Sequence, residues 1–254
     1  ESIPKENTFR VSGLKRNSQI STEEIEADIG EIIINQAAKP KVNLENPDIT
    51  FLAFVNKNEC YLGIDISHKE LNKREYKIFP SSRSLKGTIA YALLRIGGYK
   101  KTETILDPFS NSGEIPIEAA LFTTNFPVNY YAKNSWNGEV KPEIDQKTVQ
   151  KVFEKEDKKI TKPKKPLVNC FDATMPSITA SKKNAKIAGI NKAITFSRMD
   201  IDWLDTRLEK GSIHRIVTHP PENSSRTNKK EIEKLYIEFI HQANFVLKKT
   251  GTLT

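Results

Sequence analysis

The stretch that most constrains the fold of this chain is residues 103–121, ETILDPFSNSGEIPIEAAL. A short apolar run ends in Asp107, a Ser-Asn-Ser-Gly turn follows at 110–113, and an amphipathic segment begins at Glu114. This order predicts a strand, a turn and a helix, which is the opening unit of a nucleotide-binding α/β sheet. Gly113 lets the backbone approach a ligand closely, and the start of a helix offers free N–H groups. Such a unit also occurs as an ordinary βα connection, so other strands must support the interpretation.

Three later stretches repeat the pattern of an apolar run that ends in a polar residue. Residues 167–172 predict a second strand, residues 193–200 a third, and residues 214–219 a fourth that runs into two prolines. Ligands bind at the carboxyl ends of the strands in open α/β sheets. We therefore expect Asp107 and the polar ends of these three strands to gather at one edge of a sheet.

Two of the strand ends suit a nucleoside. Asp172 can accept two hydrogen bonds from a ribose diol, and Asp200 is suited to the exocyclic amine of an adenine. A second interpretation of Asp172 stays open, because an acid at a strand end can instead cap the following helix.

Motifs in both halves of the chain resemble those of a known family. DPFSNSGEIPIEAAL resembles the DP-x-C-G-S-G-T-x-x-I-E-A motif of class I S-adenosylmethionine-dependent RNA methyltransferases, and HPPE at 219–222 occupies the place of their N/D-P-P-Y/F motif. The upstream part is similar to a THUMP domain in FRVSGLKR, STEEIEADIG, ENPDITFLAFVNKNECYLGIDIS and LNKREYK. Together these stretches cover most of the chain, in the order found in THUMP-containing guanine-N2 methyltransferases of tRNA and 23S rRNA.

The resemblance implies an α/β fold with two domains. A Rossmann-like class I methyltransferase domain is expected at 84–254, a smaller α+β, THUMP-like RNA-binding domain at 1–66, and a linker at 67–83. The chain opens without Met and inside the THUMP-like pattern, and we expect Gly251 to end the last helix with only the start of a strand after it. We therefore expect that the family's N-terminal part and its C-terminal strands are missing from this chain.

The cofactor that the resemblance implies is S-adenosylmethionine. The positions that match the family's cofactor-binding motifs are Asp107, Phe109, Ser110, Asn111, Ser112, Gly113, Glu114, Asp172, Ala173, Asp200 and Ile201. The catalytic motif falls on His219, Pro220 and Pro221. In the family, the first residue of that motif and the next carbonyl accept hydrogen bonds from the target amine, and the aromatic residue stacks on the base. Methyl transfer to an amine needs such positioning more than covalent help.

The chain departs from the family pattern at four positions. A neutral His219 accepts through one ring nitrogen, and a protonated one repels an amine that gains positive charge. Glu222 cannot stack on a base, and Asn111 adds bulk where the family has glycine, although it tolerates left-handed backbone. Glu114 suits a helix N-terminus but brings a carboxylate near the expected methionine carboxylate. Together these changes predict weakened cofactor binding, weakened catalysis or both.

The first region predicts an α+β arrangement. Residues 8–15 suggest a strand, and Ser21 with Glu24 fits a capping box at the start of a helix. The expected core residues of that helix are Ile25, Ile29, Ile32 and Ile33. Residues 49–55 and 61–66 predict a hairpin across 56–59.

Amphipathic helices are expected at both ends of the second region. Residues 84–96 predict a helix that stops at Gly97 and Gly98, with a core face of Leu85, Ile89, Leu93 and Ile96. The last helix should face the core with Ile232, Leu235, Tyr236, Phe239, Ile240, Ala243, Val246 and Leu247.

The net charge of +8 and the pI near 9.2 favour an anionic partner such as RNA. Candidate RNA contacts are Lys73, Arg74 and Lys77, the aromatic and basic residues at 130–136, and the lysine-rich run at 158–165, with a helix expected at 144–156. The alternative stays open that these residues form a solvated linker, a solvated turn and, at Trp136, a lid over the core.

Other features limit the class of protein. No apolar run is long enough to cross a bilayer and the N-terminus shows no signal pattern, so we expect a cytoplasmic protein with no membrane partner. Cys60 and Cys170 should be buried free thiols in a reducing compartment, and four scattered histidines argue against a metal site.

The leading hypothesis is S-adenosylmethionine-dependent N2-methylation of a guanosine in structured RNA, with tRNA ahead of rRNA. The alternative from another class is a catalytically impaired member of the family that acts as an RNA- or protein-binding module. A third hypothesis, an N6-adenine methyltransferase, shares the N/D-P-P-Y/F motif, but the THUMP-like half argues against it.

Overall fold

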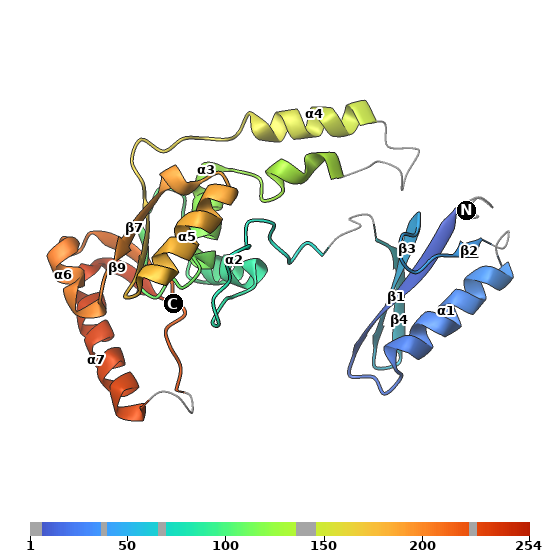
Figure 1. Ribbon diagram of the computed structural model, residues 1–254, viewed down its shortest axis with the longest axis horizontal. Helices are drawn as coiled ribbons and strands as arrows, with labels where there is room; N and C mark the ends of the chain where they lie inside the picture. Colours follow the sequence, from blue (N-terminus) through green and yellow to red (C-terminus); the bar gives the residue numbers. More distant parts are fainter. Residues whose placement is uncertain (1–6, 37–39, 66–69, 136–145, 224–227) are drawn as a thin grey trace. The chain divides into compact units, whose positions relative to one another are not determined.

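The computed structural model describes residues 7–36, 40–65, 70–135, 146–223 and 228–254. The chain divides into two compact units, residues 1–70 with 134–151 and residues 71–133 with 152–254. One sheet of four strands and one of five strands form their centres (Figure 1).

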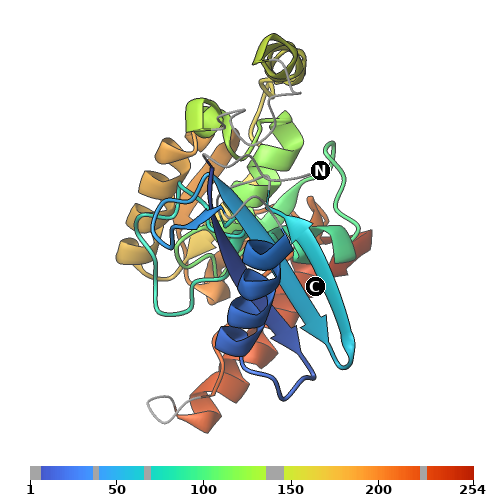
Figure 2. The same cartoon turned by 90° about the vertical axis from the view of Figure 1, so that its right-hand side faces the viewer.

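The first unit is a sheet in the order β2-β1-β3-β4, with one helix on it. Its elements are β1 (Thr8–Arg16), α1 (Thr22–Gln36), β2 (Lys41–Val42), β3 (Ile49–Asn56) and β4 (Glu59–Ile64). β1 pairs in parallel with β2 and β3, and β3 forms the expected hairpin with β4. Lys57 in its turn has a φ of 53°, as tight hairpins require. Figure 2 shows α1 lying against this sheet.

The expected capping box starts α1. The Ser21 amide donates to Glu24 Oε2 at 2.8 Å, and the Glu24 amide donates to Ser21 Oγ at 3.1 Å, which confirms that prediction. Ile25 is buried, and Ile29 and Ile33 pack against the same core. Ile32 was expected there but is 52% exposed, because it lies about one residue's rotation away from the face that meets the sheet.

The second unit holds a parallel sheet in the order β7-β6-β5-β8-β9. Its strands are β5 (Ile105–Asp107), β6 (Val168–Asp172), β7 (Ile194–Arg198), β8 (Ile213–Ile216) and β9 (Leu247–Leu253). The chain first winds outward from β5 to β7 and then resumes at β8 on the other side of β5. The topological switch point therefore lies between β5 and β8, where such folds bind their ligands.

Helices cover both faces of this sheet. One core joins β5 and β6 to α2 (Gly87–Ile96), α3 (Glu114–Thr124) and α5 (Met175–Ile187). A second core, on the face that holds Leu106 and Phe171, joins η4 (Ile201–Trp203), α6 (Leu204–Arg207) and α7 (Lys229–Val246). The remaining elements are η1 (Tyr130–Ser135), α4 (Gln146–Asp157) and η3 (Asn191–Ala193). The unit is the expected three-layer α/β fold.

The buried faces of α2 and α7 agree with the expected ones in part. In α2, Gly87, Ala90 and Leu94 are buried and the expected Leu93 packs against the core, whereas Ile89 is exposed and Ile96 is 77% exposed. In α7, the expected Phe239, Ala243 and Val246 are buried, whereas the expected Tyr236 and Ile240 are exposed. The expected Leu235 and Leu247 pack against the same core. Both helices carry apolar residues over more than half their circumference, so periodicity alone did not fix the edges of the buried face.

The last helix also ends earlier than the sequence indicated. α7 stops at Val246, and Leu247 already begins β9, with Gly251 inside that strand. A Cβ at Gly251 would lie 2.9 Å from the Lys248 carbonyl oxygen, so the glycine serves a close approach in the strand and not a helix stop.

A buried ion pair fixes the segment before α2 to α3. Arg74 donates to both carboxylate oxygens of Glu118, at 2.6 and 3.2 Å, and the Tyr76 hydroxyl donates to Oε1 at 2.9 Å. Gly87 makes room for this arrangement, because a Cβ there would lie 2.4 Å from Arg74 Cγ. Arg74 is therefore neither an RNA contact nor a solvated linker residue.

The two cysteines have different surroundings. Cys170 is buried as expected, and its thiol contacts Ser110 Oγ at 3.2 Å. Cys60 was expected to be buried but is exposed, because it lies on β4, whose residues are all exposed.

Replacing Arg74 by Met should destabilise the second unit by about 3–5 kcal/mol, because it leaves the Glu118 carboxylate buried without its partner. Amide hydrogen exchange of β5 and β6 across a urea series measures this change. Arg207→Met is the matched control, since Arg207 is exposed and should tolerate the same substitution. Equal urea midpoints for the two variants would show that the ion pair contributes no net stability.

Candidate functional site

Residues from four segments meet at the carboxyl ends of β5 and β8. They line a small pocket, whose wall is made by Arg83, Leu85, Asp107, Phe109, Ser110, Asn111, Glu114, Ile115 and His219. Its volume is about 10 Å³, which is the room that one water molecule needs. The structure thus brings the expected DPFSNSGE motif and His219 together at the switch point of the sheet.

The turn after β5 has the left-handed backbone that its sequence predicts. Asn111 and Gly113 have φ angles of 49° and 89°. A Cβ at Gly113 would lie 2.9 Å from Ser181 Cβ, so only glycine fits there. The Asn111 amide nitrogen donates to Asp172 Oδ2 at 3.0 Å, and its side chain donates to the Phe109 carbonyl at 2.8 Å. Asn111 therefore occupies the position of the family's glycine without disrupting the turn.

Ser110 and Phe109 hold the turn to its neighbours. The Ser110 amide donates to the Phe171 carbonyl at 3.0 Å, which joins the turn to β6. Phe109 packs edge-on against Phe239 of α7, with ring centroids 5.2 Å apart.

Glu114 begins α3 and is buried. Its Oε1 accepts hydrogen bonds from the hydroxyls of Ser84 and Ser112, the latter at 2.7 Å, and lies 3.6 Å from Lys77 Nζ. Lys77 also donates to the Leu85 carbonyl at 2.7 Å, so it too is part of the fold. Two hydroxyls, the helix N-terminus and a cation therefore stabilise a carboxylate at this position.

Asp107 is buried at the end of β5. Its Oδ1 accepts a hydrogen bond from the Thr218 hydroxyl at 2.5 Å and from the Phe109 amide at 3.2 Å. Burial raises the pKa of Asp107 to about 7, against the opposing effect of these two hydrogen bonds. This carboxyl group therefore changes its charge near neutral pH.

Asp172 uses both oxygens within the protein. Oδ2 accepts from the Asn111 amide, and Oδ1 accepts from the amide and hydroxyl of Thr174 at 2.9 and 3.0 Å. Thr174, not Asp172, is the N-cap of α5. Asp172 therefore does not simply cap the following helix. It joins the end of β6 to the turn after β5.

The remaining positions expected to contact cofactor lie near the same edge with different exposure. Ala173 and Asp200 are exposed, and Asp200 follows β7 by two residues. The Ile201 side chain is buried in the core shared with α7, which leaves its backbone as the part that can face a ligand.

His219 follows β8 and reaches the pocket with one nitrogen unpaired. Nδ1 is buried without a hydrogen-bond partner in the described structure, and Nε2 lies 3.8 Å from Glu222 Oε1. Pro220 and Pro221 are partly buried after it, and the Pro221 carbonyl accepts from the Tyr236 hydroxyl at 3.2 Å. An unpaired buried ring nitrogen is costly for the fold and available to a ligand.

Two residues at this site were missed from the sequence. Arg83 lines the pocket, and its Nη1 is buried without a partner in the described structure. Thr218, two residues after the end of β8, donates to Asp107 from the other side of the switch point. Neither lies in a motif, and the contacts join positions far apart in the chain, so no local signal indicated them.

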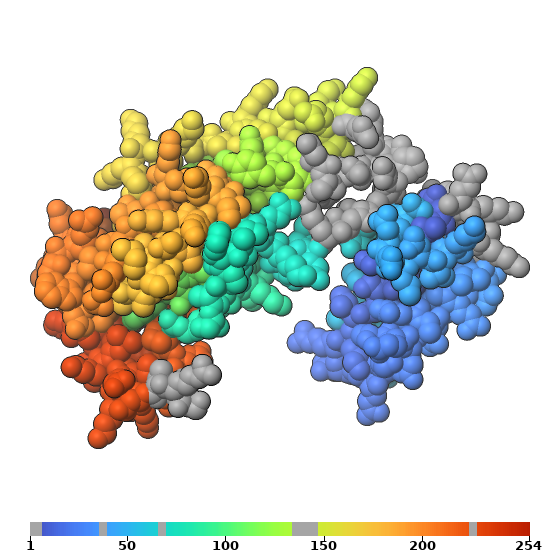
Figure 3. Space-filling model, in the orientation of Figure 1, coloured from blue at the N-terminus to red at the C-terminus, as the bar shows by residue number. Residues whose placement is uncertain are grey.

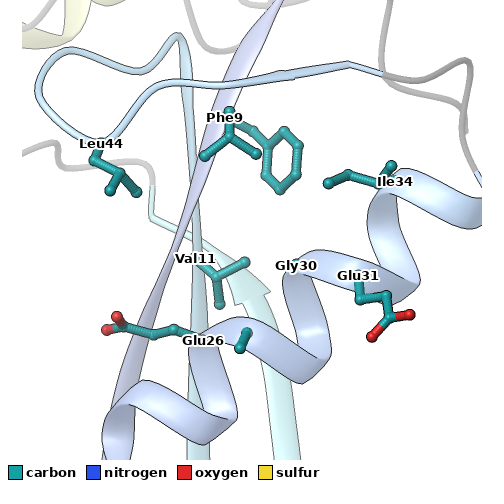
Figure 4. A pocket seen from close by; sticks show the side chains of 9 residues that line it. Phe9, Val11, Glu26, Gly30, Glu31, Ile34 and Leu44 are labelled. Atoms are coloured by element: carbon teal, nitrogen blue, oxygen red, sulfur yellow. The ribbon is translucent and has the colours of Figure 1, made fainter.

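The first unit carries a separate groove of about 410 Å³ between β1, α1 and the segment at Val42 and Leu44. Figure 4 shows Phe9, Val11, Ile34 and Leu44 around it, with Glu26 and Glu31 on the helix. The Glu26 carboxylate already accepts from the Gly13 amide at 2.8 Å. The wall of this groove is mainly apolar, so the groove does not offer the polar chemistry of the pocket at the strand ends.

The aromatic and basic segment after α3 is only partly described. Lys133 Nζ lies 3.8 Å from the ring centroid of Tyr130 and pairs with Asp157, while Tyr131 is exposed. Trp136 and residues 224–227 of the loop after HPPE lie outside the described residues. The lysines at 158, 159, 162, 164 and 165 are exposed, and Figure 3 shows this segment in yellow at the surface.

Within the described ranges of the chain, no three His, Cys, Asp or Glu side chains come together as metal ligands do. Over the same ranges, no helix combines the length and the apolar character needed to cross a bilayer.

Comparison with known families covers both units. A model described as "RMKL-like, methyltransferase domain" matches residues 74–254, and a model of the THUMP domain matches residues 1–65. Among curated proteins, the chain is 29% identical over 216 residues to the tRNA (guanine(6)-N2)-methyltransferase of Methanocaldococcus jannaschii, covering 84% of this chain. It is 26% identical over 243 residues to the ribosomal RNA large subunit methyltransferase K/L of Buchnera aphidicola, covering 92% of this chain. The chain spans 55% and 35% of the lengths of these two relatives.

Solved structures with the same fold include three with low sequence identity. A predicted N6-adenine-specific DNA methylase from Listeria monocytogenes matches with a TM-score of 0.76 at 23% identity, over 95% of this chain and 64% of that one. A putative methyltransferase complexed with SAH matches with a TM-score of 0.74 at 19% identity, over the same shares. TrmN from Thermus thermophilus matches with a TM-score of 0.66 at 22% identity, over 98% of this chain and 60% of that one.

Replacing Asp107 by Asn should give a variant whose stability, compared with that of the unchanged protein, increases as the pH rises. The folded protein holds the Asp107 proton up to a pKa of about 7, whereas the unfolded chain releases it near pH 3.9, so this group's stabilisation is lost between those values. Between about pH 5.5 and about pH 8, the unchanged protein should lose about 2 kcal/mol relative to the variant. The Asn oxygen can still accept from Thr218 and Phe109.

Urea denaturation of both proteins at the two pH values measures this difference, and other titrating groups cancel because both proteins share them. A stability difference that does not change with pH would show that Asp107 is already ionised at the lower value.

Proposed function

We propose a function from the family to which the chain belongs, the RMKL-like methyltransferases, and from the THUMP domain ahead of its methyltransferase domain. The proposed reaction is methylation of the exocyclic N2 of a guanosine in structured RNA, with S-adenosylmethionine as methyl donor. The observation that supports this most strongly is the pocket at the switch point, where the turn after β5 and His219 meet. The fold shared with a methyltransferase complexed with SAH supports the choice of cofactor.

In the proposed complex, the cofactor lies along the carboxyl ends of β5, β6 and β7. The turn from Phe109 to Glu114 approaches its amino-acid part, and the ammonium group faces Asp107. Asp172 has lone-pair capacity beyond its internal hydrogen bonds and accepts from one ribose hydroxyl. Asp200 and the backbone at Ala173 and Ile201 lie on the adenine side.

His219 takes the place of the acceptor for the target amine. In the neutral tautomer with its proton on Nε2, the ring leaves the unpartnered Nδ1 able to accept from the amine. The Pro220 carbonyl supplies the second acceptor. Together they hold the nitrogen in line with the methyl group, and the chain's own contribution to the reaction is this positioning.

We propose tRNA as the substrate, because the relative from Methanocaldococcus jannaschii is named for a tRNA guanine. The large-subunit rRNA is the second candidate, since the Buchnera relative is named for it. The exposed lysines at 158–165 and the net charge of +8 suit either RNA. Glu222, which cannot stack on a base, supports the alternative of a family member that binds RNA with little or no methyl transfer.

Asp172→Ala should weaken the binding of S-adenosylhomocysteine by about 1.5–3 kcal/mol, the range for a hydrogen bond to a charged group. Titration calorimetry measures the affinity, and Asp202→Ala, which removes an exposed acid nearby, is the control. Stability should fall as well, because Asp172 holds the Asn111 amide. Lower stability with unchanged affinity would assign Asp172 to the fold alone.

The double variant His219→Asn with Glu222→Tyr should raise methyl transfer to guanosine, because it restores an amide acceptor and a stacking face. Incorporation of labelled methyl groups into a tRNA transcript, followed by nucleoside analysis, measures the product. RNA affinity should fall steeply with salt in both proteins and differ little between them, since phosphate contacts do not use these residues. Salt-sensitive RNA binding without any binding of S-adenosylhomocysteine would favour the binding-module alternative.

A further inference from the structure

Arg83 is a cation of the pocket whose position the fold does not explain. It lines the pocket beside Asp107, Glu114 and His219, and its Nη1 is buried without a hydrogen-bond partner among the described residues. A buried charged donor without a partner destabilises a fold, so native proteins rarely keep one without a ligand. Arg83 therefore calls for an acceptor that enters the pocket from outside the chain.

The segment that carries Arg83 is held firmly to the turn after β5. Ser84 donates to Glu114 and lies 2.7 Å from Ser112 Oγ, and the Ser81 amide donates to Ser112 Oγ at 3.2 Å. Residues on both sides of Arg83 are thus fixed to the motif that faces the cofactor in the proposed complex. The guanidinium group is presented at the pocket by this attachment.

The charges around the pocket match a ligand group that carries both signs. Asp107 and Glu114 supply carboxyl groups, and Arg83 supplies the guanidinium. The Glu114 carboxylate is already stabilised by two hydroxyls and by Lys77 at 3.6 Å, so it does not use the charge of Arg83. An α-amino-acid end has an ammonium and a carboxylate on one carbon, so it offers a group of opposite charge both to these carboxyl groups and to Arg83.

We infer that Arg83 binds the carboxylate of the amino-acid end of S-adenosylmethionine and so selects for a donor that carries this group. This assignment rests on the proposed function. A guanidinium group binds a carboxylate through two parallel hydrogen bonds, which suits a buried site better than a lysine would. This attraction offsets the repulsion between the ligand carboxylate and the Glu114 carboxylate at the start of α3. An RNA phosphate is the competing acceptor, and the experiment below distinguishes the two.

The test compares two donors that differ only in the carboxylate, S-adenosylmethionine and decarboxylated S-adenosylmethionine. Titration calorimetry gives the affinity of each for the unchanged chain, for Arg83→Gln and for Arg83→Lys. Lys86→Gln is the matched control, because Lys86 is exposed and its side chain does not cap α2. The four affinities of chain and variant form a cycle that isolates the contact between Arg83 and the carboxylate.

Arg83→Gln should lower the affinity for S-adenosylmethionine by at least about tenfold and the affinity for the decarboxylated donor by less than about twofold. Arg83→Lys keeps the positive charge but not the two parallel N–H donors of the guanidinium group. It should therefore weaken the binding of S-adenosylmethionine to a smaller extent and leave the binding of the decarboxylated donor unchanged. It also keeps the test decisive if Arg83→Gln does not fold. Lys86→Gln should change neither affinity.

Equal weakening of both donors, or no weakening of either, would overturn the assignment of Arg83 while leaving the proposed function intact. The same holds if the unchanged chain binds the two donors equally well, or if Arg83→Gln weakens RNA binding and not donor binding. Failure of the unchanged chain to bind either donor would instead overturn the proposed cofactor, and the role of Arg83 with it.

Discussion

The hydrogen bond from the Asn111 amide to Asp172 holds the candidate site together. It fixes the turn after β5 to the end of β6, and Ser181 of α5 closes the arrangement by donating to the Asn111 carbonyl at 2.9 Å. Three elements that are far apart in the chain therefore depend on two residues in left-handed backbone, Asn111 and Gly113. If this turn moved, Asp107, Glu114 and the first turn of α3 would lose their places at the switch point.

Besides Asp172, three buried carboxyl groups near this turn are stabilised in different ways. Asp107 accepts from Thr218, Glu114 from two serines near Lys77, and Glu118 from Arg74 and Tyr76. Most of these partners lie between residues 74 and 84. The sequence predicted a linker over most of this segment, yet its side chains stabilise the carboxyl groups of Glu114 in the pocket wall and of Glu118 in α3. A buried carboxylate stays in a fold only where donors or cations of this kind meet it.

Local patterns predicted the elements of the fold well and its long-range contacts poorly. The capping box at Ser21, the hairpin around Lys57 and the presence of the four strands were readable because they depend on neighbouring residues, although β7 and β8 end before Asp200 and His219. The edges of the buried faces of α2 and α7 were not, because apolar residues extend over more than half the circumference of both helices. The pairing of Arg74 with Glu118 spans 44 residues, and nothing in the sequence near either one indicates it.

The four departures from the family motif now fall into two groups. At Asn111 and Glu114 the structure supplies a compensation: the backbone adopts the left-handed form that Asn tolerates, and hydroxyls with Lys77 satisfy the carboxylate. At His219 and Glu222 it does not, since Nδ1 has no partner in the described structure and the Glu222 side chain is 81% exposed. The fold itself needs the turn after β5, whereas it does not need the target-base motif. Any loss of activity should therefore begin on the side of the target base and not on the side of the cofactor.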